Sequence, residues 1–222
     1  MTAQQVEGPN VYSVFWVLRR ARAGDRSGSS EQLQQALLSQ DGVRLRGAYS
    51  LAGLRPDADA ILWLHGNDLD AIQTTWTCMV ETEAGRDIEA VNTYLGVVTP
   101  SQYVADHSPA FIRGVAPRRY LSVYPFVKTA EWYLLPYEER QRMMREHGEL
   151  GREFPGILTN TVSSFGLADQ EFVVAIEGDD PGEIMQMMQR LRAAEVRKYT
   201  TYDTPIYLGR RMDVEDVLQL LV

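Results

Sequence analysis

The stretch that decides the fold is YLSVYPFV, residues 120–127, followed after a short gap by YEERQRMMREHGELGREF, residues 137–154. The first segment alternates apolar residues in the manner of a β-strand. In the second, Met143, His147 and Leu150 fall at steps of four and three, a spacing that places side chains on one face of a helix. The pair therefore predicts a strand followed by a long amphipathic helix.

The segments downstream of this pair continue a regular order of elements. Periodicity predicts strands at 157–165 and 171–177, a helix at 181–199 and a strand at 205–209. The second half of the chain thus follows the order strand, helix, strand, strand, helix, strand.

The first half of the chain repeats this order. Periodicity predicts strands at 11–17, 43–51, 60–63 and 90–98 and helices at 29–38 and 69–82. Tandem ferredoxin-like repeats explain a length of 222 residues. Packing their two sheets face to face gives a dimeric α+β barrel within one chain. An unrelated α+β arrangement is the alternative that periodicity leaves open.

Composition restricts the classes of partner. The net charge of -8 and a pI near 5.0 argue against a nucleic-acid binder, because phosphate contacts need clustered lysines and arginines. The single cysteine, Cys78, cannot form an internal disulfide, which fits a reducing compartment, and we expect a cytoplasmic protein. The apolar runs are too short to span a bilayer, so we expect no membrane contact.

Two residues invite a functional interpretation, each beside a structural one. His147 is either a hydrogen-bonded core histidine or an axial ligand presented by a rigid helix. Gly148 and Gly151 beside it would let a flat ring approach, although each costs about 1 kcal/mol inside a helix. Tyr124 is either a core tyrosine or an oxidisable phenol facing a pocket. Trp132 adds an oxidisable ring nearby, although such clusters usually serve packing.

Lys128 and His107 are further candidates. Lys128 shares the strand face of Tyr124 if the strand runs straight, where it could hold a carboxylate beside the phenol. It could equally extend from the strand end into solvent. His107 lies in the linker 101–119, where it is either solvated surface or a general base for a weak acid such as hydrogen peroxide. Motifs for phosphate binding, serine hydrolysis and zinc catalysis are absent.

From about residue 101 to 212 the sequence resembles the chlorite dismutase-like superfamily, and within it the coproheme decarboxylases of the actinobacterial type. The resemblance rests on ordered blocks, which are Ala105–Phe111, Val123–Lys128, Glu131–Pro136, Glu138–Arg140 leading to Glu146–Gly148, Asn160–Val162 with Ser164 and Phe165, and Leu191–Arg192 with Glu195. The first half matches this superfamily more loosely.

The resemblance implies an enzyme of haem biosynthesis. Its reaction is the hydrogen peroxide-dependent oxidative decarboxylation of two propionates of Fe-coproporphyrin III (coproheme), which gives haem b. Coproheme is then both substrate and redox cofactor. By this resemblance His147 ligates the iron, Tyr124 becomes the radical that takes hydrogen from a propionate, and His107 is the base for peroxide.

The same resemblance implies further contacts. It assigns Lys128, Asn160 and Arg192 to the binding of coproheme, and it suggests that Glu195 hydrogen-bonds the free nitrogen of His147. Chlorite dismutases carry arginine where this chain has Asn160, so chlorite chemistry is disfavoured.

The resemblance also implies how the whole chain is organised. The expected domains are residues 1–104, a repeat without haem, and residues 105–222, the repeat that binds coproheme. Relatives form homo-oligomers, commonly homopentamers, and a transient contact with the coproporphyrin ferrochelatase is expected. Two alternatives are a haem-binding carrier or sensor without turnover and a peroxidase-like enzyme with another substrate.

Overall fold

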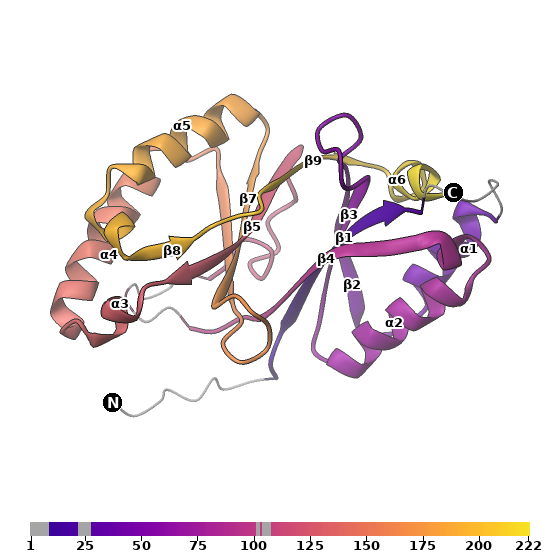
Figure 1. The fold of residues 1–222 in the computed structure, drawn as a ribbon, viewed down its shortest axis with the longest axis horizontal. Helices are drawn as coiled ribbons and strands as arrows, with labels where there is room; N and C mark the ends of the chain where they lie inside the picture. Colours follow the sequence, from indigo (N-terminus) through magenta and orange to yellow (C-terminus); the bar gives the residue numbers. More distant parts are fainter. Residues whose placement is uncertain (1–8, 22–27, 101–102, 104–107) are drawn as a thin grey trace. The chain divides into compact units, whose positions relative to one another are not determined.

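The computed structural model of the chain (Figure 1) describes residues 9–21, 28–100, 103 and 108–222. It has a mixed α+β fold in two compact units. The first comprises Met1–Val98 and Leu208–Val222, and the second comprises Thr99–Tyr207. The predicted division after residue 104 assigned the whole C-terminus to the second half, and in this respect the structure differs from it.

The first unit contains an antiparallel sheet. Its strands are β1 (Tyr12–Arg20), β2 (Val43–Ser50), β3 (Ala60–Gly66), β4 (Ile88–Val97) and most of β9 (Tyr207–Met212). Their order is β4-β1-β3-β2, and β9 adds to β2 at the edge. The pairing of β9 with β2 is what joins the C-terminal stretch to this unit.

Helices cover one face of this sheet (Figure 1). They are α1 (Ser30–Leu37), α2 (Leu69–Glu81), η1 (Ala84–Asp87), α6 (Val214–Leu218) and η3 (Gln219–Leu221). The alternating residues Val14, Trp16 and Leu18 of β1 pack in one apolar core with Leu33 of α1 and Ile72 of α2. Strand residues that alternate and helix residues at helical spacing therefore pack in the same core.

The second unit has a second antiparallel sheet. Its strands are β5 (Tyr120–Lys128), β6 (Leu158–Ser163), β7 (Phe172–Gly178) and β8 (Thr200–Tyr202). Within the unit their order is β6-β7-β5-β8. A register shift between Val127 and Lys128 marks an irregularity at the end of β5.

The helices of the second unit are α3 (Ala130–Leu134), α4 (Tyr137–Gly151), α5 (Pro181–Arg192) and η2 (Glu195–Tyr199). The start of α5 is capped by Asp180, whose carboxylate accepts the backbone N–H of Gly182 at 2.8 Å. This helix packs through Ile184 and Met187 on the sheet face that carries Tyr124. Across the described residues, no helix combines the length and apolarity needed to cross a membrane.

Several element boundaries differ from the sequence-based prediction. The helix predicted to 154 ends at Gly151, because Pro155 disfavours a helical conformation in the residue before it. The helix predicted over 181–199 ends at Arg192 and resumes as the short turn η2. The strand predicted at 205–209 begins at Tyr207 as β9 and runs to Met212, and the short strand β8, which was not predicted, pairs with β5.

Candidate functional site

Tyr124 lies on the face of the second sheet that α5 covers. It is 6% exposed and packs with Ile176 and Ile184 in an apolar cluster. Its hydroxyl donates a hydrogen bond to Sδ of Met188 at 3.7 Å. Burial raises the pKa of Tyr124, with a smaller contribution from the negative charge of Asp203. The phenol therefore keeps its proton at any physiological pH.

Lys128 ends the same strand and is also buried, at 9% exposure. Its ammonium nitrogen lies 4.2 Å from the ring centroid of Trp132 and 5.2 Å from that of Phe126. Among the residues that the structure describes, nothing forms an ion pair or hydrogen bond with this ammonium. Burial lowers the pKa of Lys128 to about 8, against the opposing charge of Glu171. A buried cation held only by aromatic rings is a site for a carboxylate.

Glu171 is the carboxylate whose charge acts on Lys128, yet its Oε2 is bound elsewhere. This oxygen accepts the backbone N–H of Lys128 at 2.7 Å and the hydroxyl of Tyr133 at 2.5 Å. The hydrogen bond to Glu171 and, above all, burial raise the pKa of Tyr133. These two contacts hold the carboxylate beside the main chain of β5.

His147 lies half-buried on α4, with a buried Nδ1. Met143 and Leu150, on the same helix face, pack in the cluster that contains Trp132. A Cβ built at Gly151 would meet no described atom within 4 Å, and one at Gly148 would meet only the tip of Arg152. Packing among the described residues therefore does not require either glycine. The space at these two positions would let a flat ring approach this part of α4.

No group of three or more His, Cys, Asp or Glu side chains that could hold a metal ion occurs in the described part of the chain. A single imidazole is enough for the iron of a macrocycle, because the ring supplies the remaining ligands. The residues present thus fit a haem-type group better than a free metal ion.

The side chain of Asn160 has partners within the protein. It pairs with Ala175 across the strands, whereas Tyr124 pairs with the next residue, Val174, so the two side chains point to opposite faces of the sheet. The amide nitrogen donates to the carbonyl of Ala175 at 3.3 Å and to Oε1 of Glu177 at 3.0 Å. The amide nitrogen thus has two acceptors within the protein, and the predicted contact of Asn160 with coproheme stays a prediction.

Arg192 lies at the end of α5 and shares one carboxylate with another arginine. Its Nη1 lies 2.6 Å from Oδ2 of Asp203, and Nη1 of Arg197 lies 3.0 Å from the same oxygen. Asp203 is buried, whereas both arginines are partly exposed. The three groups leave one net positive charge near Tyr124. No spacing or motif in the sequence marked Arg197 or Asp203.

His107 lies outside the described residues, so its predicted role as a base stays a prediction. The chain on either side of it is anchored. The phenol oxygen of Tyr103 accepts from Arg140 at 3.3 Å, and its ring stacks on that of Tyr137 at 5.9 Å. Further on, the backbone N–H of Phe111 donates to the side-chain oxygen of Asn160 at 3.0 Å.

Glu195 contacts cations in this structure. One carboxylate oxygen accepts from Arg142 at 2.7 Å, and the other lies 3.6 Å from the ammonium of Lys198. The hydrogen bond from Arg142 lowers the pKa of Glu195. Its predicted hydrogen bond to His147 stays a prediction.

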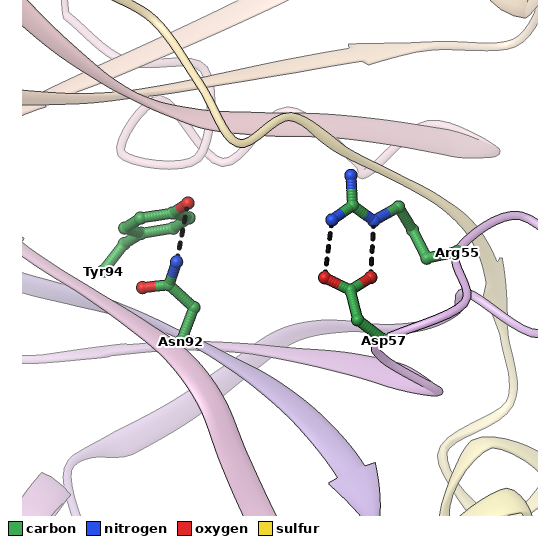
Figure 2. Close-up of polar contacts among 4 residues, drawn as sticks. All are labelled: Arg55, Asp57, Asn92 and Tyr94. Carbon is green, nitrogen blue, oxygen red and sulfur yellow. Dashed lines mark hydrogen bonds and ion pairs between the residues drawn. The ribbon is translucent and has the colours of Figure 1, made fainter.

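The polar contacts of the first unit tie its own loops and strands together. In Figure 2 the guanidinium of Arg55 donates hydrogen bonds to both carboxylate oxygens of Asp57, at 2.8 and 2.7 Å. On β4, the amide of Asn92 donates to the hydroxyl of Tyr94 at 3.1 Å. In both pairs the polar groups shown bind one another.

Comparison with known proteins places the chain in a family. The family model for chlorite dismutase matches residues 26–212. The chain is 38% identical over 214 residues to a protein from Mycolicibacterium smegmatis named coproheme decarboxylase, which covers 95% of this chain and 93% of that one. It is 27% identical to a protein from Halobacterium salinarum described as a proposed heme-binding protein, over 93% of this chain and 47% of that one.

A solved structure shares the fold. A mutant chlorite dismutase from Candidatus Nitrospira defluvii superposes with a TM-score of 0.85, at 22% identity and with 95% of each chain covered. The family match spans most of the chain and both compact units. This protein belongs to the chlorite dismutase family.

Proposed function

We propose that this protein is a coproheme decarboxylase, an enzyme that converts Fe-coproporphyrin III to haem b in haem biosynthesis. The observation that carries the proposal is the 38% identity to the Mycolicibacterium smegmatis enzyme of that name, over nearly the whole of both chains. The buried phenol and the buried ammonium on one strand supply the groups that such a reaction uses.

The reaction balances with hydrogen peroxide as the oxidant. One propionate loses carbon dioxide and becomes a vinyl group while one peroxide is reduced to two waters, and the sequence occurs twice. When bound, the iron of coproheme would pass the oxidising equivalents of peroxide to the protein. We assign His147 as the ligand that holds this iron, because it offers a rigid, half-buried imidazole beside open space.

Tyr124 is proposed to remove hydrogen from the β-carbon of a propionate. Its phenol is protonated, and its partner Met188 is a thioether that cannot accept a proton. A neutral radical forms when the phenol loses a proton along with the electron, so we assign the proton acceptor to a group other than Met188, either water or a carboxylate of bound coproheme. His107 is proposed to take a proton from peroxide, as a neutral imidazole can near pH 7.

Binding of the propionates is proposed to use Lys128 and Arg192. An unpaired buried ammonium attracts a carboxylate strongly, because little water screens the charge. Arg192 adds a second cation whose direction is set by Asp203. Both residues lie in the second unit, so we propose that this unit, Thr99–Tyr207, binds coproheme and that the first unit is the repeat without haem.

We also propose that the chain is a tandem of ferredoxin-like repeats that close into a dimeric α+β barrel. The strand orders β4-β1-β3-β2 and β8-β5-β7-β6 correspond element by element and support this proposal. A homopentameric assembly, a cytoplasmic location and a transient contact with the coproporphyrin ferrochelatase complete the proposal.

A haem-binding carrier is the second candidate, and the similarity to the Halobacterium salinarum protein favours it. One experiment separates the two. Purified protein is loaded with coproheme, peroxide is added, and the mass of the extracted macrocycle is measured. Loss of two carboxyl groups supports the enzyme, whereas a bound but unchanged macrocycle supports the carrier. His147→Ala is the control, because it should alter the absorption spectrum of the bound macrocycle.

A further inference from the structure

The ammonium of Lys128 lies in an unusual setting for a buried cation. Buried charges in proteins are normally paired with an opposite charge, because desolvation costs several kcal/mol. Here the described partners are two aromatic rings, with Trp132 the nearer at 4.2 Å. A neutral ring stabilises the cation without cancelling its charge. The site therefore keeps one uncompensated positive charge.

A carboxylate that could cancel this charge is present and is held in another direction. Glu171 influences Lys128 electrostatically, yet no ion pair within 4.0 Å joins them. Its Oε2 is tied by the main-chain N–H of Lys128 and by the hydroxyl of Tyr133. Tyr133 is itself fixed by an edge-on contact with Phe165, at 5.9 Å between centroids.

Trp132 is fixed as firmly as the lysine that it holds. It is buried, and its ring also contacts Tyr103 at 6.1 Å and Tyr199 at 5.7 Å. The ring therefore has little freedom to turn away from the ammonium. Trp132 and Tyr133, which are adjacent in α3, therefore both act on Lys128. Trp132 contacts the ammonium with its ring, and Tyr133 holds the carboxylate of Glu171.

We propose that Trp132 and Tyr133 are positioning residues for Lys128: Trp132 holds the ammonium by a cation–π contact, and Tyr133 keeps Glu171 from pairing with it. The ammonium then stays available for a carboxylate of the substrate. This inference rests on the proposed function, in which Lys128 receives a propionate of coproheme. Neither residue touches the reacting atoms in this account.

The Tyr133 half of the proposal is tested by a rescue. Tyr133→Phe removes the hydroxyl that tethers Glu171, so the carboxylate can turn toward Lys128. The dissociation constant and KM for coproheme should rise about tenfold, while kcat stays within about twofold. Adding Glu171→Gln should restore binding, because the competing charge is gone. Tyr202→Phe is the matched control, since its hydroxyl bonds a backbone carbonyl at 3.5 Å.

Two outcomes would overturn this half. If Tyr133→Phe binds coproheme as tightly as the wild type, the tether has no effect on Lys128. If the double variant binds as weakly as Tyr133→Phe alone, the loss comes from packing rather than from Glu171. Binding is measured by absorbance titration without peroxide. A wild type that binds coproheme but does not decarboxylate it would refute the proposed function and leave this test intact.

The Trp132 half is tested by changing the ring electronically, because a smaller residue at a buried position could disturb folding. The chain has four tryptophans, which are replaced globally by mono-, di- and trifluorinated tryptophan. Fluorine weakens the negative face of the ring, so coproheme affinity should fall stepwise, by about 5- to 30-fold over the series. In a Lys128→Met background, which removes the cation and keeps all four tryptophans, the same series should be flat. A flat series in the wild type, or an equal slope in both, contradicts the proposal.

Discussion

The contacts of Tyr124 predict how removal of its phenol oxygen would affect stability and activity. Tyr124→Phe keeps the buried ring and removes only the weak hydrogen bond to Met188, so the free energy of unfolding should change by no more than about 1 kcal/mol. Coproheme should still bind, and formation of vinyl groups should stop. Product mass and thermal unfolding check the two parts, and continued decarboxylation would remove Tyr124 from the mechanism.

Lys128 couples stability to pH. Burial lowers its pKa to about 8 from 10.5, with Glu171 opposing and Arg197 adding to the shift. Between these two values the unfolded chain binds more protons at this lysine than the folded chain, so this residue makes the free energy of unfolding rise with pH. Below about pH 8 the lysine is charged in both states and the cost of its burial is fully present.

Lys128→Met should therefore stabilise the free protein at pH 7, by about 1–3 kcal/mol. The gain should shrink as pH rises from about 8 toward 10.5, while coproheme binding weakens at every pH below 8. Urea unfolding at pH 7 and pH 10 measures the first effect and absorbance titration the second. A variant that is less stable than the wild type at pH 7 would contradict this account.

Spacing made Tyr124, Lys128 and His147 candidates by fixing the face of a strand or helix on which each lies, and the resemblance to the chlorite dismutase-like superfamily then assigned their roles. The sequence could not identify Asp203 or Glu171. Their roles depend on contacts between segments far apart in the chain, such as the one between Glu171 and the main chain of Lys128. Nor could the sequence show that the side chain of Asn160 binds Ala175 and Glu177 within the protein.

At the scale of elements, Gly148 and Gly151 lower the stability of helix α4 and leave space where larger side chains would lie. Gly151→Ala should raise the free energy of unfolding of the free protein by about 1 kcal/mol, because alanine favours a helix and the added Cβ meets no described atom. The same methyl group should weaken coproheme binding if the ring approaches this side of His147. Higher stability with unchanged binding would show that the space does not serve the ligand.

Asn160 joins β6 to β7 and to the segment that follows His107. Asn160→Ala would leave the N–H of Phe111 and the carboxylate of Glu177 without these hydrogen bonds in a buried place. The free energy of unfolding should fall by about 2–3 kcal/mol. Chemical unfolding measures the loss, and Thr161→Ala on the exposed neighbouring position is the control. A change below about 0.5 kcal/mol would contradict the anchoring role.

Element type was predictable where periodicity was long, as in α4 and α2, and boundaries were not. Short segments such as α3 and β8 carry too few residues to show a period. Yet α3 supplies both Trp132 and Tyr133, so the element that the periodicity missed is the one that surrounds Lys128.

At the scale of the whole molecule, the two compact units share an order of elements, and the chain returns to its first unit at the C-terminus. Periodicity could not predict this return, because it indicated a strand at 205–209 but not that β2 is a partner of this strand. The proposed division of labour places chemistry in the second unit, where an uncompensated positive charge and a protonated phenol share one strand.

The most direct measurement of the central claim is a stoichiometric peroxide titration of the protein loaded with coproheme, followed by mass spectrometry of the extracted macrocycle. The account predicts conversion in two steps, each using one peroxide and removing one carboxyl group, with haem b as the final product in the wild type and unchanged coproheme in Tyr124→Phe. Unchanged coproheme in the wild type, or equal conversion in both proteins, would contradict it.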